Sequence, residues 1–178
     1  MMRRSVLMLA AIVAMVVAAA GVALAVGVLG TKGNDTLNGT SERDAIVGAH
    51  GNDTINGRNE ADQLYGDKDD DTLLGGQGDD YLEGGRDKDN LKGEAGNDYL
   101  NAVDGTGAND KVDGGEETPD TSTDTCVIDA GDSVRTGTTD TPIADQAAAN
   151  ATTNSSCEKI YVVPVPQATA ATTVAGTT

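Results

Sequence analysis

The feature that most constrains this chain is a nine-residue period that runs from Gly30 to Asn101 without an insertion or a deletion. All eight units have glycine at position 1, aspartate at position 6 and a branched aliphatic residue at position 8. The units are GTKGNDTLN, GTSERDAIV, GAHGNDTIN, GRNEADQLY, GDKDDDTLL, GGQGDDYLE, GGRDKDNLK and GEAGNDYLN. A strict short period of this kind indicates a solenoid, in which each repeat packs only against its neighbours.

Each unit divides into a polar part and a short strand. The first six residues are rich in Gly, Asn and Asp, which favour tight turns with positive φ angles. The last three have one central aliphatic side chain, which suits a short strand with one buried face. Two units therefore form one coil of 18 residues. Stacked coils predict an all-β fold, a parallel β-roll with two sheets and a thin core of position 8 side chains.

The same stacking brings the position 6 carboxylates together. Successive coils lie about 4.8 Å apart, so the aspartates form two columns of like charge that repel each other. The odd units contribute Asp35, Asp53, Asp71 and Asp89, and the even units contribute Asp44, Asp62, Asp80 and Asp98. A cation between the rungs would relieve this repulsion, and hard oxygen ligands favour calcium over softer metals and over magnesium. Because the core is thin, we expect several calcium ions to supply much of the folding free energy.

The units resemble the calcium-binding nonapeptide of the RTX, or hemolysin-type, family. The resemblance is close over residues 30–101, loose over 102–134, and does not extend to the two ends. It implies a parallel β-roll that holds calcium in its turns and is disordered without calcium. The metal-binding residues it implies are Asp35, Asp44, Asp53, Asp62, Asp71, Asp80, Asp89, Asp98 and Asp110, with turn glycines Gly33, Gly51, Gly78 and Gly96.

Position 4, usually glycine in the family, is where this chain departs from the pattern. The other four units carry Glu42, Glu60, Asp69 and Asp87 there. These acids either strain the turn and weaken a site, or add a carboxylate that tightens it. The first interpretation is favoured, because a side chain at positive φ costs about 1 kcal/mol. Sites between two glycine-bearing turns, Asp35 with Asp53 and Asp80 with Asp98, are then expected to be best formed.

The pattern continues less regularly towards the C-terminus. A ninth unit, GTGANDKVD, follows a three-residue insertion and places Asp110 and Val112 in register. Triplets of the form D-x-apolar recur at Asp124 and Asp132 and predict the closing end of the roll. The expected domains are a signal peptide (1–25), the roll (26–134), a C-terminal cap with a flexible excursion (135–166) and a disordered Ala/Thr tail (167–178).

Cys126 and Cys157 are the only cysteines, and both follow the regular repeats. In an exported chain a disulfide between them is the expected state. Metal ligation is the alternative, although no histidine lies nearby. Residues 159–163 (KIYVV) read as a strand added to the cap, where the disulfide would hold it.

The N-terminal 25 residues predict export. Arg3 and Arg4 precede an apolar run, and Ala23-Leu24-Ala25 fits a signal-peptidase site. Because the run from residue 6 to 29 is long enough to span a bilayer, an uncleaved membrane anchor is the alternative. Loss of the two arginines changes the net charge from −17 to −19, which argues against nucleic-acid partners. We therefore expect a secreted, monomeric protein of bacterial type, with an unknown protein or surface partner.

No catalytic constellation is recognisable, so the chain is predicted not to be an enzyme. His50 is the sole histidine, and it has no nucleophile partner in the sequence. Tyr81 and Tyr99 should stack on one outer strand face, as packing or as a ligand platform. Thr36, Thr54 and Thr72 form a polar column that resembles an ice-binding surface in general layout. The function alternatives left open are an adhesive, matrix or ice-binding-like module and an accessory domain of an extracellular hydrolase.

Overall fold

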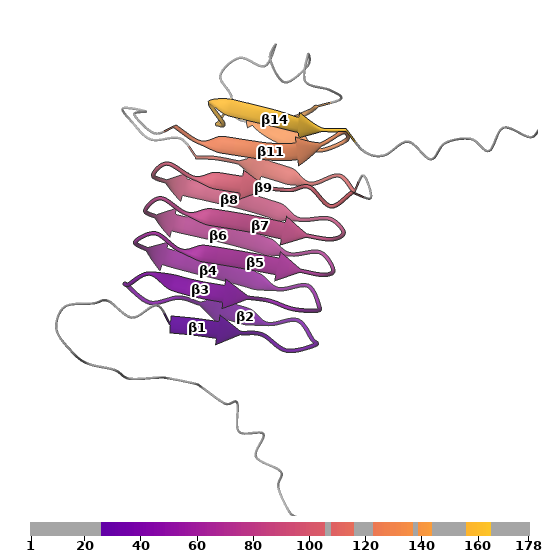
Figure 1. Ribbon diagram of the computed structural model, residues 1–178. Coiled ribbons are helices and arrows are strands. Elements are labelled where there is room, and N and C mark those ends of the chain that lie inside the picture. Colours follow the sequence, from indigo (N-terminus) through magenta and orange to yellow (C-terminus); the bar gives the residue numbers. More distant parts are fainter. Residues whose placement is uncertain (1–25, 106–107, 116–122, 137–138, 144–155, 165–178) are drawn as a thin grey trace, which may run out of the picture.

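Figure 1 shows the computed structural model, a stack of flat coils with one sheet on each side. It describes residues 26–105, 108–115, 123–136, 139–143 and 156–164. The strands are β1 (Val26–Leu29), β2 (Thr36–Asn38), β3 (Asp44–Val47), β4 (Thr54–Asn59), β5 (Gln63–Asp67), β6 (Thr72–Gln77), β7 (Tyr81–Gly85), β8 (Asn90–Ala95), β9 (Tyr99–Asn101), β10 (Lys111–Asp113), β11 (Thr125–Asp129), β12 (Ser133–Thr136), β13 (Thr139–Pro142) and β14 (Lys159–Val163).

The strands alternate between two seven-stranded sheets, which confirms the predicted parallel roll. One sheet has the order β1-β3-β5-β7-β9-β11-β14, and the other has the order β13-β12-β10-β8-β6-β4-β2. Within the regular repeats each residue pairs with the residue 18 positions later, as Leu37 does with Ile55 and Ile55 with Leu73. This register follows from the period, because two units of nine residues complete one coil.

The core is a single file of position 8 side chains between the sheets. Its regular part consists of Ile46, Ile55, Leu64, Leu73, Leu82, Leu91 and Leu100, all fully buried. The N-terminal end is less covered, since Val28 and Leu37 are only partly buried. The degenerate C-terminal coils extend the same file with Val112, Cys126, Ile128, Val134 and Ile143.

Insertions in the degenerate region do not shift the register of the sheets. The predicted ninth unit is confirmed, because Val112 pairs with Leu91 on the neighbouring rung. The turn before it absorbs the three extra residues. Cys126 likewise pairs with Leu100 and points into the core, as expected. The longer segment between β10 and β11 therefore leaves the stack without breaking the ladder.

Several strands are longer than the predicted three residues. β4, β6 and β8 each have six residues and run into the first part of the next unit. The ladder continues there because position 2 of most units adopts a left-handed φ, between 78° and 116°, in successive rungs. Arg58, Gly76 and Glu94 pair in this way. Position 4 was expected to need positive φ, and the structure adds position 2.

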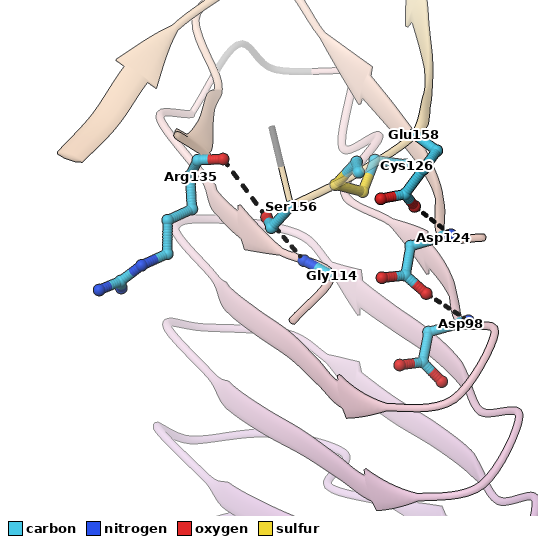
Figure 2. Close-up of a disulfide and its surroundings, with 8 residues drawn as sticks. Asp98, Gly114, Asp124, Cys126, Arg135, Ser156 and Glu158 are labelled. Carbon is cyan, nitrogen blue, oxygen red and sulfur yellow. Dashed lines mark hydrogen bonds between the residues drawn. A yellow bond between two sulfur atoms is a disulfide. The ribbon is translucent and has the colours of Figure 1, made fainter. Parts of the chain in front are cut away.

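The C-terminal end combines the predicted strand with an antiparallel pair. β14 spans the predicted residues and pairs in parallel with β11, and the Cys126–Cys157 disulfide lies beside it. Ser156 accepts a hydrogen bond from the Gly114 N–H and donates one to the Arg135 carbonyl oxygen (Figure 2). β13 pairs antiparallel with β12, which the repeat does not predict. The predicted signal peptide, tail and most of the excursion lie outside the described residues.

Candidate metal centre

One carboxylate oxygen of each ladder aspartate is held by the neighbouring rung. The Oδ1 atom of Asp53 accepts the backbone N–H of Asp35 at 2.7 Å, and that of Asp62 accepts the N–H of Asp44 at 2.7 Å. The same bond recurs at Asp71, Asp80, Asp89, Asp98, Asp110, Asp124 and Asp132, with lengths of 2.8 to 3.0 Å. The carboxylates are thus anchored by hydrogen bonds along the column, which sequence reasoning from charge repulsion missed.

The second carboxylate oxygen is buried and has no hydrogen-bond partner at seven of the nine predicted aspartates. These are Asp53, Asp62, Asp71, Asp80, Asp89, Asp98 and Asp110, each 2% exposed or less. Buried polar atoms in proteins are nearly always satisfied, and an unpaired buried charge is costly. A repeated set of orphaned carboxylate oxygens in register is therefore the arrangement expected of cation ligands.

Glycine at position 1 brings backbone oxygens to the same place. A methyl group built on Gly57 would collide with Asp62 Oδ2 and lie 2.6 Å from the carbonyl oxygen of Gly75, one coil later. Gly75 has the same surroundings, with Asp80 Oδ2 and the carbonyl oxygen of Gly93. Any larger residue at position 1 would fill the space where these oxygens converge. The repeat identified these glycines as invariant within the chain, but only the coordinates show this reason.

Burial raises the pKa of the ladder carboxyl groups. Removal from water is the main cause, and the neighbouring aspartate of the column adds to it. The pKa rises from 3.8 to about 7 for Asp71 and Asp80, and to about 8 for Asp89 and Asp98. The backbone N–H bond to each carboxylate opposes the rise without cancelling it. Ionised carboxylates in these columns are therefore unfavourable unless a cation lies beside them.

The first two turns differ from the others. Asp35 Oδ2 accepts hydrogen bonds from the N–H and hydroxyl of Thr31, at 2.7 and 2.9 Å. Asp44 Oδ2 accepts the same pair from Thr40, at 2.6 and 3.1 Å. Threonine at position 2 lacks the left-handed φ found there in later units, and its N–H points at the carboxylate instead. Protein groups therefore satisfy the oxygen that is orphaned elsewhere.

The predicted turn glycines fall into two groups. Gly51, Gly78 and Gly96 adopt φ between 99° and 133°, whereas Gly33 does not adopt positive φ. Of the two pairs expected to form the best sites, Asp80 and Asp98 both keep an orphaned oxygen. In the other pair Asp53 keeps one, while that of Asp35 is bonded to Thr31. The geometry thus favours the later pair.

The acids at position 4 do not join the orphaned oxygens. Glu60, Asp69 and Asp87 adopt left-handed φ between 64° and 74°, so they occupy the strained conformation that glycine relieves elsewhere. Asp69 Oδ2 accepts the N–H of Gly51 at 2.9 Å, one coil earlier. This carboxylate therefore stabilises the turn below it.

Among the described residues, no group of three or more His, Cys, Asp or Glu side chains lies close enough to hold a metal by side chains alone. Cation binding in the turns therefore requires carboxylate and backbone oxygens together, and both are present around Asp62 and Asp80. Mixed oxygen sets of this kind are what calcium prefers.

The outer sheet faces carry the other predicted columns. Tyr81 and Tyr99 stack as expected, with ring centroids 5.4 Å apart and planes at 5°, and Tyr65 adds a third ring 5.7 Å from Tyr81. Because the rings face each other, this arrangement favours packing between rungs over a ligand platform. The threonine column is in register but is followed by Asn90. His50 lies 3.1 Å from the amino group of Lys68.

Fold and turns together define a class of protein, the parallel β-solenoid with oxygen-lined cation sites between stacked turns. The family model described as RTX calcium-binding nonapeptide repeat (4 copies) matches residues 29–64, 58–91 and 65–100. The repeat region of this chain, residues 29–100, therefore belongs to the RTX calcium-binding nonapeptide repeat family. Comparison with curated proteins and with solved structures gave no match.

Proposed function

We propose that this protein is a secreted, monomeric, non-catalytic protein whose β-roll folds when calcium binds in its turns. RTX repeats in a β-solenoid suggest a calcium-binding structural role. The observation that carries the proposal is the run of seven buried Oδ2 atoms without partners, each in register with the next of its column. Calcium, when bound, supplies the positive charge that these oxygens lack.

The chain's own groups divide the work of binding. The backbone N–H of one rung orients the carboxylate of the next through Oδ1, so Oδ2 is presented in a constant direction. Glycine at position 1 leaves the space, and carbonyl oxygens complete the set. The proposed carboxylate ligands are Asp53, Asp62, Asp71, Asp80, Asp89, Asp98 and Asp110, with carbonyl oxygens of Gly66, Gly75, Gly84, Gly93 and Gly114.

Export is supported by the sequence of the first 25 residues. The arginine pair, apolar run and Ala23-Leu24-Ala25 form a secretion signal, and β1 begins at Val26. Cleavage after Ala25 therefore leaves all the described strands in the mature protein. In the described part of the chain, no helix has the length and hydropathy needed to cross a bilayer.

A calcium titration of the exported protein tests the proposed function. Circular dichroism in metal-free buffer at pH 8 should show little sheet, and calcium should restore it cooperatively. Isothermal titration calorimetry should count several ions per chain. Magnesium is the matched control, and it should act only at much higher concentration because it requires a tight octahedral shell. Full sheet content in excess chelator at pH 8, or an equal response to magnesium, would refute the proposal.

A further inference from the structure

The N-terminal end of the even aspartate column contains one unexplained carboxylate oxygen. Asp44 is 1% exposed, and its Oδ1 has no hydrogen-bond partner. On later rungs, the atom that bonds Oδ1 is the backbone nitrogen of the residue aligned one coil earlier, as Asp44 N–H bonds Asp62 Oδ1. The residue aligned one coil before Asp44 is Val26, the first residue of β1. The nitrogen of Val26 is therefore the missing donor by position.

Val26 is also the residue that directly follows the proposed export-signal cleavage site. Hydrolysis adds water across the Ala25–Val26 amide. The oxygen of water goes to the carbonyl carbon of Ala25, which leaves as a carboxylate. The nitrogen of Val26 takes up both hydrogens and becomes an α-ammonium, which is charged at neutral pH. A peptide N–H has one direction set by the preceding carbonyl group, whereas an ammonium has three donors and rotates freely.

We propose that export processing completes the fold: removal of residues 1–25 creates an α-ammonium on Val26 that pairs with Oδ1 of Asp44. This inference rests on the proposed export of the protein. With Oδ2 already bonded to Thr40, the carboxylate of Asp44 is then fully satisfied by protein groups. The first even rung is closed without calcium, and the calcium sites of this column begin at Asp62.

The opposite end of the same column is also closed by a group from outside the repeats. Asp98 donates its N–H to Asp124, and Asp124 donates its own to the carboxylate of Glu158 in the cap (Figure 2). The even column thus has a non-repeat carboxylate at its C-terminal end and, in our proposal, an ammonium at its N-terminal end. Asp35, which starts the odd column, is only half-buried and does not have an orphaned buried oxygen.

The test compares two chains that differ only in where the ammonium lies. One begins at Val26 and the other at Ala25, each released from a cleavable fusion, so both have the same charge. In calcium-saturated protein, hydrogen exchange of β1 and β3 amides should be slower by roughly tenfold or more in the Val26 chain, because bonds to charged groups contribute more than neutral ones. Exchange in β8 should be the same in both and serves as the internal control.

Asp44→Asn in both chains completes the cycle, because it removes the charge and keeps the shape. The difference between the Val26 and Ala25 chains should then disappear. Equal exchange in the two unsubstituted chains overturns the ion pair, as does a difference that persists in the asparagine pair. If Asp44→Asn does not fold, the unsubstituted pair still decides. N-terminal sequencing of the exported protein tests the cleavage site separately, so failure of export and failure of the ion pair are distinguishable.

Discussion

Replacing Asp80 by asparagine should change the stability of the roll in opposite directions with and without calcium. Asp80 is 2% exposed, its Oδ1 accepts the N–H of Asp62 at 2.8 Å, and its Oδ2 is orphaned. Asparagine keeps the first bond, removes the charge, and places an N–H donor where carbonyl oxygens converge. Without calcium the substitution therefore relieves a buried charge, and with calcium it removes a ligand.

The size of the effect follows from the pKa of Asp80. Burial, with the charge of Asp62, raises that pKa from 3.8 to about 7. Because one pKa unit is equivalent to about 1.4 kcal/mol, ionised Asp80 destabilises the calcium-free roll by up to about 4 kcal/mol above pH 7. This is a large part of the total stability of a small domain, about 5 to 15 kcal/mol. With calcium, the midpoint for calcium-induced folding should rise roughly tenfold or more, since affinity depends on ligand charge.

Circular dichroism at pH 8, in metal-free buffer and over a calcium titration, measures both effects. Asp79→Asn is the matched control. Asp79 is the exposed neighbour, and hydrogen bonds from the N–H and side-chain amide of Asn97 hold its pKa below the usual value. Its substitution should change little in either condition. The reasoning fails if Asp80→Asn lowers sheet content equally with and without calcium, or behaves as the control does.

Three further predictions follow from the same geometry. Without metal, the roll should be most stable near pH 4 and unfold as the pH rises towards 8, because folding raises the ladder pKa values from 3.8 to about 7 or 8 and the folded state binds protons more tightly; constant sheet content over this range would contradict it. Asp53→Ala should raise the calcium midpoint more than Asp44→Ala, because only the first has an orphaned Oδ2, and equal midpoints would count against the assignment. Reduction of Cys126–Cys157 should open the C-terminal end to proteolysis, since the loop it closes contributes about 3 to 4 kcal/mol, while calcium-induced sheet in residues 30–101 persists; mass spectrometry of the fragments checks this, and complete digestion of the roll would disprove it.

The features that repeat with a fixed period were predictable from the sequence. Two units of nine residues make a coil of 18, so the alignment of Ile55 with Leu73 follows by counting. The inward position of Cys126 follows from the D-x-apolar triplet in the same way. The strand at residues 159–163 was predictable because it has a run of β-branched and aromatic residues. These properties depend on local spacing and composition, which one chain carries in full.

The turn chemistry was predictable only in part. The spacing predicts which carboxylates stack, but whether a backbone N–H reaches one oxygen or both depends on the distance between rungs. Thr31 and Thr40 show this most clearly, because β-branched residues at position 2 change the φ of the turn and bond the oxygen that later turns leave orphaned. No rule of spacing distinguishes them from the alanine or arginine in the same place.

The N-terminal boundary separates the two kinds of information most sharply. By composition, residues 6–29 form one apolar run with no internal break. The sequence by itself determined the repeat, the parallel roll and the two aspartate columns, because these need only periodicity. Only the tertiary structure decided that Val26–Leu29 leaves the apolar run and pairs with β3, with Val28 aligned to Ile46. The physical reason is that strand pairing joins residues 18 apart, so the partner of an apolar segment is set by the coil above it.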